Sequence, residues 1–517
     1  MDTILILDFG SQSTQLIGRR IRQLGVYSRI VPGDAPFSSI DFSDVRGIIL
    51  SGSPFSVYEK GAPRADKGIY EKDLPMLGIC YGFQSMSADN GGTVASLGSK
   101  EYGRARILLK EKTTLFSRLD GDSFLSWMSH GDSVTEAPAG FRVIGQSENG
   151  LAAAFVNEDR RMWGVQFHPE ASHCEHGQQI LQAFAVDICK ARQEWNIESF
   201  LRSEKESLRR RVGERDVVLL ISGGVDSSVV AALLLKSLNP RRVHLMYIDT
   251  GLMRDGESQE VARSLAELGA LYLHLIDASK EFYEGLAGLT DPEQKRRVIG
   301  DLFIKVQEKE IDALGIRDSF LAQGTLYTDL VESGKGVGDK AKVIKTHHNV
   351  RSPLVEAKRA AGLIIEPLSS LYKDEVRELG TVLGLPAAVV NRHPFPGPGL
   401  AVRIVGEVTP EKCDLLRKAD ALFMAELRSR GFYEKIWQAF CVLLPVRSVG
   451  VSGDVRRYGH VLALRAVASL DAITADVYPI PMKDLLEISS LITNRIPEIG
   501  RVVYDISSKP PATIEWE

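Results

Sequence analysis

A cysteine in the first third of the chain has the surroundings of a hydrolase nucleophile. In the segment GICYGFQ, Cys80 follows an apolar run and is flanked by Gly78 and Gly82 at G-x-C-x-G spacing. Glycines at these positions allow a sharp turn from a strand into a helix, which exposes the side chain between them. A helix N-terminus beside the sulfur favours the thiolate, the form that attacks carbonyls. Because many cysteines are simply buried structural residues, this segment alone leaves that alternative open.

The segment VQFHPEAS supplies a base that suits such a nucleophile. The proline after His168 forces an extended backbone, so His168 and Glu170 point to the same face at a period of two. A cysteine nucleophile needs a histidine whose tautomer is fixed by a carboxylate. A lone histidine would more often be structural, but this pair predicts a catalytic triad of Cys80, His168 and Glu170.

A glycine-bearing loop after another apolar run could complete this site. The segment LSGSPFS, residues 50–56, could offer backbone N–H groups to an oxyanion. Together, GICYGFQ, QFHPE and SGSP resemble the class I glutamine amidotransferases. The resemblance implies that glutamine is hydrolysed through a thioester on Cys80, with release of ammonia. It also implies a set of glutamine-binding residues: Gly52, Gln84, Ser129 and His130.

One residue of this loop departs from the amidotransferase pattern. The family usually has SGGP, whereas this chain carries Ser53 at the third position. Serine would be strained there if the position required a positive φ.

Two histidine-containing segments raise the question of a metal site. SHCEHG contains His173, Cys174 and His176, and THHNV contains His347 and His348. A closed metal site usually needs a fourth ligand. A polar surface loop is therefore the favoured interpretation of the first segment, and a nucleotide contact or plain loop surface that of the second.

The segment LISGGVDSSVV, residues 220–230, has the form of a phosphate-binding loop but lacks the usual lysine. It links an apolar run to a helical pattern, so backbone N–H groups, a helix N-terminus and serine hydroxyls can converge on a phosphate. A Walker A loop would carry a lysine that reaches the β and γ phosphates. Here Asp226 instead suits a Mg²⁺ that screens the phosphates. The expected ATP-binding residues are Ser222, Gly223, Gly224, Val225, Asp226, Ser227 and Ser228.

This loop resembles the PP-loop of ATP pyrophosphatases. The resemblance implies that ATP, with Mg²⁺, is cleaved to AMP and pyrophosphate while an acceptor oxygen is adenylylated. The loop would then hold the β and γ phosphates as a leaving group, and ammonia from the cysteine site would displace the AMP. A glycine-rich turn before an ordinary helix is the alternative for any short glycine motif.

Both motifs are expected at the ends of strands in α/β domains. In the first third, short apolar runs alternate with helical patterns, which predicts a parallel or mixed sheet. A polar helical stretch beginning near residue 192 leads into a second series of the same kind, which predicts a doubly wound parallel sheet with ligands beyond the carboxyl ends of its strands. The cluster RHPFPGPGLAVR breaks regular structure near residue 395 and marks a second boundary.

Segments along the whole chain, in the expected order, resemble the glutamine-hydrolysing GMP synthases. Among them are YIDTGLMRDGE, QGTLYTDLVES, RHPFPGPGLAVR, GVSGDVRRYGH and RVVYDISSKPPATIEWE. The resemblance implies that XMP, ATP, glutamine and water give GMP, AMP, pyrophosphate and glutamate, the last step of guanine nucleotide synthesis from IMP. In this reaction the xanthine O2 is adenylylated and ammonia attacks C2.

The same resemblance divides the chain into three domains. Residues 1–197 would form a class I amidotransferase α/β domain, and residues 198–394 a doubly wound, parallel-sheet ATP pyrophosphatase domain. Residues 395–517 would form a C-terminal α+β domain that binds XMP and makes a homodimer.

The final residues should dock rather than fray. SKPPATIEWE contains two prolines that stiffen it and a tryptophan that favours burial, although a solvated tail is the alternative. The resemblance implies a set of XMP-binding residues: Lys509, Thr513, Ile514 and Glu515. A lysine near a nucleotide phosphate is physically reasonable.

Three further residues depart from the family pattern. Thr328 replaces a proline, and Arg351 and Ser352 replace glycines in a segment expected to be a mobile lid. The changes at Arg351 and Ser352 bear on the stiffness and closing of this lid rather than on catalytic identity.

Composition narrows the possible partners. The 517 residues include 63 basic and 67 acidic side chains, so a net charge of -4 gives no footprint for nucleic acid or anionic lipid. No apolar run approaches the ~18 residues that span a bilayer, and no signal peptide is evident. Five scattered cysteines without a CxxC pair favour a reducing cytoplasm over a disulfide framework.

Two alternative functions remain at this stage. Another glutamine-fed PP-loop ligase, such as an NAD synthetase, would leave the C-terminal third unexplained. A catalytically silent nucleotide-binding relative would be expected to have lost a reactive residue, yet Cys80, His168, Glu170 and Asp226 are all present.

Overall fold

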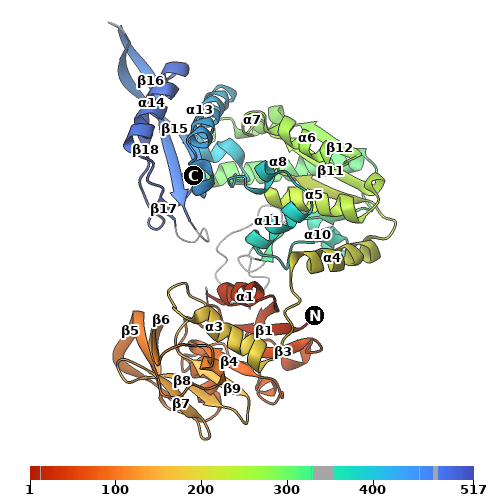
Figure 1. The fold of residues 1–517 in the computed structure, drawn as a ribbon. Helices are drawn as coiled ribbons and strands as arrows, with labels where there is room; N and C mark the ends of the chain where they lie inside the picture. Colours follow the sequence, from red (N-terminus) through yellow and green to blue (C-terminus); the bar gives the residue numbers. More distant parts are fainter. Residues whose placement is uncertain (12, 328, 330–352, 453–454, 470–474) are drawn as a thin grey trace. The chain divides into compact units, whose positions relative to one another are not determined.

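The computed structural model of the chain describes residues 1–11, 13–327, 329, 353–452, 455–469 and 475–517. It separates into two compact units. One contains Met1–Phe200, and the other contains residues 201–326 and the described residues from 353 onward. Each unit combines helices with sheets (Figure 1). Within the described residues, no helix is both long and apolar enough to cross a membrane.

The first unit is built on one mixed sheet with the strand order β2-β1-β3-β4-β9-β8-β7-β5-β6. Pairing is parallel from β2 to β9 and antiparallel from β9 to β6. The strands are β1 (Thr3–Asp8), β2 (Tyr27–Pro32), β3 (Val45–Leu50), β4 (Met76–Ile79), β5 (Thr93–Leu109), β6 (Ser123–Glu136), β7 (Arg142–Ser147), β8 (Ala152–Asn157) and β9 (Met162–Val165).

Helices cover both faces of this sheet. Along β1, Ile4 and Ile6 join the hydrophobic cluster that includes α1 (Thr14–Gln23) and α3 (Gly177–Gln182). The alternate residues Leu5 and Leu7 join a second cluster with α2 (Tyr81–Asp89). A strand buried on both faces reads as a continuous apolar run, which explains why the α/β prediction is confirmed here.

The second unit begins with the predicted doubly wound sheet. Its strands are all parallel and have the order β12-β11-β10-β13-β14. They are β10 (Val217–Ile221), β11 (Val243–Asp249), β12 (Tyr272–Asp277), β13 (Phe320–Ala322) and β14 (Ile364–Ile365). The strand order reverses between β10 and β13, where such sheets bind ligands. The loop at residues 222–224 follows β10 and therefore lies at this point.

Helices precede, separate and follow these strands along the chain, as expected for repeated βα units. They are α4 (Ile197–Val212), α5 (Val225–Ser237), α6 (Glu257–Glu267), α7 (Ser279–Leu286), α8 (Pro292–Ala313), α10 (Pro353–Ala360), α11 (Lys373–Val382) and α12 (Ala387–Val390).

The C-terminal part of the second unit forms another sheet. Strand β16 pairs antiparallel with β15 and β17 and parallel with β18. The elements are α13 (Pro410–Ser429), β15 (Gln438–Ser452), β16 (Val455–Ala468), β17 (Asp476–Val477), α14 (Met482–Arg495) and β18 (Ile499–Tyr504).

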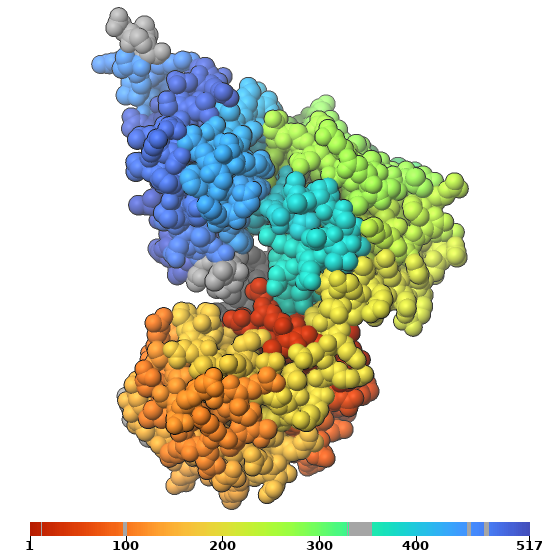
Figure 2. Space-filling view, viewed as in Figure 1, coloured from red at the N-terminus to blue at the C-terminus, as the bar shows by residue number. Residues whose placement is uncertain are grey.

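One hydrophobic core joins the two sheets of the second unit. The same cluster contains Val218 of β10, Phe282 of α7, Leu416 of α13 and Leu462 of β16. In Figure 2 the blue C-terminal surface adjoins the green surface of the earlier helices and strands. Because this core is shared, the predicted domain boundary between residues 394 and 395 stays a prediction. The predicted boundary between residues 197 and 198 also stays a prediction.

Candidate active sites

Cys80 lies at the turn between β4 and α2. Its backbone has φ 54° and ψ -106°, a conformation that non-glycine residues rarely adopt. A Cβ atom on Gly82 would lie 2.2 Å from the carbonyl oxygen of Leu50, so glycine is required for α2 to pack this close to β3. The turn places the thiol at the N-terminus of α2, where the helix dipole favours a thiolate.

His168 and Glu170 form a buried pair. The distance from His168 Nδ1 to Glu170 Oε1 is 2.7 Å, and Glu170 is fully buried. Burial alone would lower the pKa of His168, but Glu170 and the Cys80 thiol outweigh it and raise this pKa well above its ordinary value. Because Nδ1 donates to the carboxylate, Nε2 is left to take a proton from the thiol. The geometry suits general base catalysis.

Three of the four predicted glutamine-binding residues lie around this triad. A Cβ atom on Gly52 would be 3.5 Å from His168 Cε1. The Cys80 thiol contacts the carbonyl oxygen of Ser129 at 3.7 Å, and Gln84 lies one helical turn after Cys80. The fourth residue, His130, is buried next to Ser129, and its ring faces Glu101.

The strain considered for Ser53 is not present. Ser53 is not among the non-glycine residues with positive φ, and its hydroxyl donates to the carbonyl oxygen of Phe9 at 2.8 Å. Serine is therefore compatible with this loop.

The SHCEHG segment, residues 172–177, forms a turn before α3 in which Ser172, His173 and Glu175 are exposed. Cys174 is buried, and the rings of His173 and His176 pack against Trp127 and Phe124. The prediction of a polar surface loop therefore holds for the exposed residues of the segment, whereas Cys174 packs into the hydrophobic cluster of the first unit. The second histidine segment, with His347 and His348, lies outside the described residues, as do Thr328, Arg351 and Ser352.

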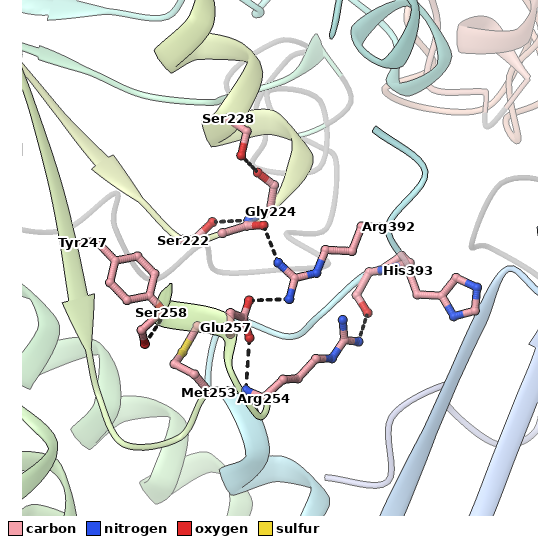
Figure 3. Close-up of polar contacts among 12 residues, drawn as sticks. Ser222, Gly224, Ser228, Tyr247, Met253, Arg254, Glu257, Ser258, Arg392 and His393 are labelled. Atoms are coloured by element: carbon pink, nitrogen blue, oxygen red, sulfur yellow. Dashed lines mark hydrogen bonds and ion pairs between the residues drawn. The ribbon is translucent and has the colours of Figure 1, made fainter. Parts of the chain in front are cut away.

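The phosphate loop between β10 and α5 has the expected strand-loop-helix form. Gly223 has φ 76°, which glycine adopts without strain. The hydroxyls of Ser227 and Ser228 donate to the carbonyl of Gly224 at 3.1 and 3.0 Å, and the Gly224 N–H donates to Ser222 Oγ at 3.3 Å (Figure 3). Hydrogen bonds between serine hydroxyls and the backbone of Gly224 therefore stabilise the turn, which leads directly into α5.

A lysine does reach this loop, although it comes from elsewhere in the chain. Lys373, the first residue of α11, donates from Nζ to both carboxylate oxygens of Asp226, at 2.6 and 2.7 Å. Sequence reasoning assigned no role to Lys373, because 147 residues separate it from Asp226. The segment YKDEVR contains no local signal for this contact.

An arginine supports the loop at Gly223. Arg392 donates to the Gly223 carbonyl at 2.9 Å and forms a 2.8 Å ion pair with Glu257, which is almost fully buried (Figure 3). A Cβ atom on Gly223 would lie 2.8 Å from Glu257 Oε1. Gly223, Arg392 and Glu257 therefore form one packed group, of which sequence reasoning found only the glycine.

The tail docks on the second unit. Arg465, fully buried, donates to the carbonyls of Thr513 and Ile514. The Glu515 carboxylate accepts two hydrogen bonds from buried Arg403 and one from Gln438, and Lys509 pairs with Ala475 through the backbone. Docking is therefore confirmed. Trp516 was expected to favour burial, but it stays 39% exposed because its indole N–H donates to Asp505.

Comparison with protein families gives three matches in order along the chain. Residues 5–188 match the model for glutamine amidotransferase class-I. Residues 196–295 match the model for NAD synthase, and residues 425–516 match the GMP synthase C terminal domain.

Curated relatives match over the full length. A GMP synthase (glutamine-hydrolysing) of Symbiobacterium thermophilum is 48% identical over 516 residues, which are 100% of this chain and 99% of the relative. Relatives with the same name from Aquifex aeolicus and Campylobacter jejuni are 48% and 49% identical, each over 99% of both chains.

Proposed function

The chain belongs to the family of glutamine-hydrolysing GMP synthases, and we propose that its two units divide this reaction between them. The first would release ammonia at Cys80, and the second would activate XMP at the loop after β10. The observation that carries the proposal is the presence of both sites in a chain that matches these relatives from end to end. An NAD synthetase alone would leave residues 425–516 without an explanation.

At the first site, the Cys80 thiolate attacks the carboxamide carbon of glutamine. His168 takes the thiol proton and returns it to the departing ammonia, while Glu170 holds the ring. Water then hydrolyses the thioester to glutamate. The proposed glutamine-binding residues are Gly52, Gln84, Ser129 and His130, and their positions near the Cys80 turn support this assignment.

At the second site, residues 222–228 hold the β and γ phosphates of ATP. The xanthine O2 of XMP attacks the α phosphorus, and pyrophosphate leaves with both electrons of the broken bond. Ammonia then attacks C2, and AMP leaves. The glycine turn and the N-terminus of α5 suit a departing anion, and the ammonium group of Lys373 adds a positive charge at the loop.

Asp226 is the residue that would hold the Mg²⁺ accompanying ATP. Its carboxylate is partly exposed at the start of α5 and accepts from Lys373. Mg²⁺ in ATP sites is typically held by one or two carboxylates together with phosphate oxygens and water, so this residue fits the ion. When bound, the ion screens the phosphate charge.

XMP would bind beside the docked tail, at Lys509, Thr513, Ile514 and Glu515. Two arginines support this placement, Arg403, which is fully buried, and Arg254, whose side chain is 13% exposed. Both stack on the ring of Phe395. Within the described residues Arg403 Nη1 lacks a hydrogen-bond partner, and so does Arg254 Nε, which lies 4.0 Å from Asp420 Oδ2. Buried donors without partners are costly, and the oxygens of a nucleotide would satisfy them. Arg403 also holds Glu515.

We further propose a homodimer formed by the residues after 394. The support is a group of exposed apolar side chains in that region: Val449, Val451, Tyr458, Met482 and Leu486. The cytoplasm is the proposed location, because all five cysteines are free thiols, as in a reducing compartment.

The nucleotide products test this function directly. Incubation of the chain with XMP, ATP, Mg²⁺ and glutamine should give GMP, AMP and pyrophosphate in equal amounts, measured by anion-exchange chromatography. Formation of ADP and orthophosphate would contradict adenylylation. AMP release with deamido-NAD in place of XMP would favour an NAD synthetase instead.

A further inference from the structure

A buried carboxylate next to the glutamine-binding segment has no part in the chemistry described so far. Glu101 on β5 lies directly opposite His130 on β6 in the antiparallel ladder, and both side chains are at most 5% exposed. Glu101 Oε2 is 3.1 Å from His130 Nε2, and Oε1 accepts 2.8 Å hydrogen bonds from Ser147 and Asn149. A buried carboxylate is costly unless it is well paired. The hydrogen bonds with His130, Ser147 and Asn149 offset the cost of burying the Glu101 carboxylate.

The hydrogen bonds of His130 require one extra proton in this pair. Its Nδ1 lies 2.9 Å from the carbonyl oxygen of Asp132, and its Nε2 faces the Glu101 carboxylate. Both partners are acceptors, whereas a neutral imidazole has a single N–H. One further proton, shared between His130 Nε2 and Glu101 Oε2, completes both hydrogen bonds. With this shared proton the pair has no net charge, which lowers the cost of burying it.

His130 connects this pair to Gln84. The carbonyl oxygen of Asp132 accepts from His130 Nδ1 and also from Gln84 Nε2, at 2.9 and 2.7 Å. Gln84 Nε2 donates in addition to Gln166 Oε1, at 3.1 Å. Both N–H bonds of the Gln84 amide therefore have partners, which fixes the direction of its oxygen.

We propose that Glu101 is a positioning residue for glutamine hydrolysis. Through His130, it holds the backbone of residues 129–132 and the Gln84 amide in the arrangement that binds glutamine. This inference rests on the proposed function, from which Gln84, Ser129 and His130 take their roles. Its effect falls on substrate binding, because Glu170 orients the catalytic His168 through a separate contact.

Two substitutions at residue 101 distinguish the effect of the hydrogen bonds of Glu101 from the effect of the volume that its side chain fills. In Glu101→Gln, the new amide can donate to a neutral His130 ring while its oxygen still accepts from Ser147 and Asn149. Glu101→Leu fills a similar volume but has no acceptor. We expect Glu101→Leu to raise the KM for glutamine about tenfold and to change kcat less than about threefold. Glu101→Gln should stay within about threefold of the unsubstituted chain in both constants.

The same proteins carry an internal control. GMP synthesis from added ammonium should be unchanged in both variants, because it bypasses the glutamine site. Asn149→Ala removes one donor to Glu101 from an exposed position and should raise the KM for glutamine about twofold to threefold. If Glu101→Leu fails to fold, Asn149→Ala tests whether Glu101 positions the glutamine-binding residues.

Several results would overturn the inference. One is a KM for glutamine that does not change in Glu101→Leu, and another is a KM that rises as much in Glu101→Gln as in Glu101→Leu. A third is a loss of ammonium-dependent synthesis as large as the loss of glutamine-dependent synthesis. Where the leucine variant does not fold, the contradicting result is an unchanged KM for glutamine in Asn149→Ala. An unsubstituted chain that makes GMP from ammonium but never from glutamine would instead refute the proposed function, and the inference with it.

Discussion

Glu170 sets the charge of His168. Its carboxylate is fully buried and lies 2.7 Å from Nδ1, and it raises the pKa of His168 against the opposing effect of burial. A histidine that retains its proton can balance a neighbouring thiolate. In the proposed mechanism, the pair of thiolate and protonated histidine that attacks glutamine therefore depends on Glu170, which contacts His168.

We expect Glu170→Gln to lower kcat/KM for glutamine about 100-fold. The amide can still accept from Nδ1, but without the negative charge the pKa of His168 falls. Since the pKa is raised in the native site, the ring normally keeps its proton to a higher pH. In the variant the ring loses its proton at lower pH, so the alkaline limb of the pH profile of glutamine hydrolysis should shift to lower pH.

Ammonium-dependent synthesis serves as the control for this variant, and Glu158→Gln, a substitution of an exposed carboxylate, should leave both activities unchanged. An unaltered profile in Glu170→Gln would show that the carboxylate charge is not needed.

At the scale of elements, the phosphate loop depends on a support that lies far away in the sequence. Arg392 follows α12, and Glu257 begins α6; their ion pair holds the Gly223 carbonyl. Removing one member of a buried pair leaves the other charge uncompensated, which costs more than removing both.

Arg392→Met should therefore raise the KM for ATP about tenfold, with glutamine and with ammonium alike, because the loop serves both reactions. Adding Glu257→Gln should give less than the sum of the two single effects in a double-mutant cycle. Arg242→Met, which removes a more exposed ion pair, is the matched control. Strict additivity would mean that the two residues act independently.

The parts predictable from sequence are those whose signal is local. The turns at Cys80 and Gly223 follow from glycines and apolar runs within about ten residues. Lys373 and Arg392 reach the same loop from 147 and 169 residues away. No period or motif encodes such contacts, which arise only when parallel strands bring distant segments to one sheet edge. Glu101 gave no local signal either, because its partners His130 and Ser147 lie on other antiparallel strands, 29 and 46 residues further along the chain.

At the scale of the whole molecule, the chain carries two chemistries in two compact units. The thiol site lies entirely in the first unit, and the phosphate loop and docked tail lie in the second, where one hydrophobic core joins both sheets. Each site takes its reactive side chains from its own unit. The loss of one site should therefore leave the other able to work when ammonia is supplied.

Cys80→Ala tests this separation most directly. GMP formation from XMP and ATP should be measured for this variant with glutamine and, separately, with ammonium. The account predicts that glutamine-driven synthesis falls at least about 1,000-fold, while ammonium-driven synthesis stays within about twofold of that of the unsubstituted chain. Equal loss of both activities would contradict it.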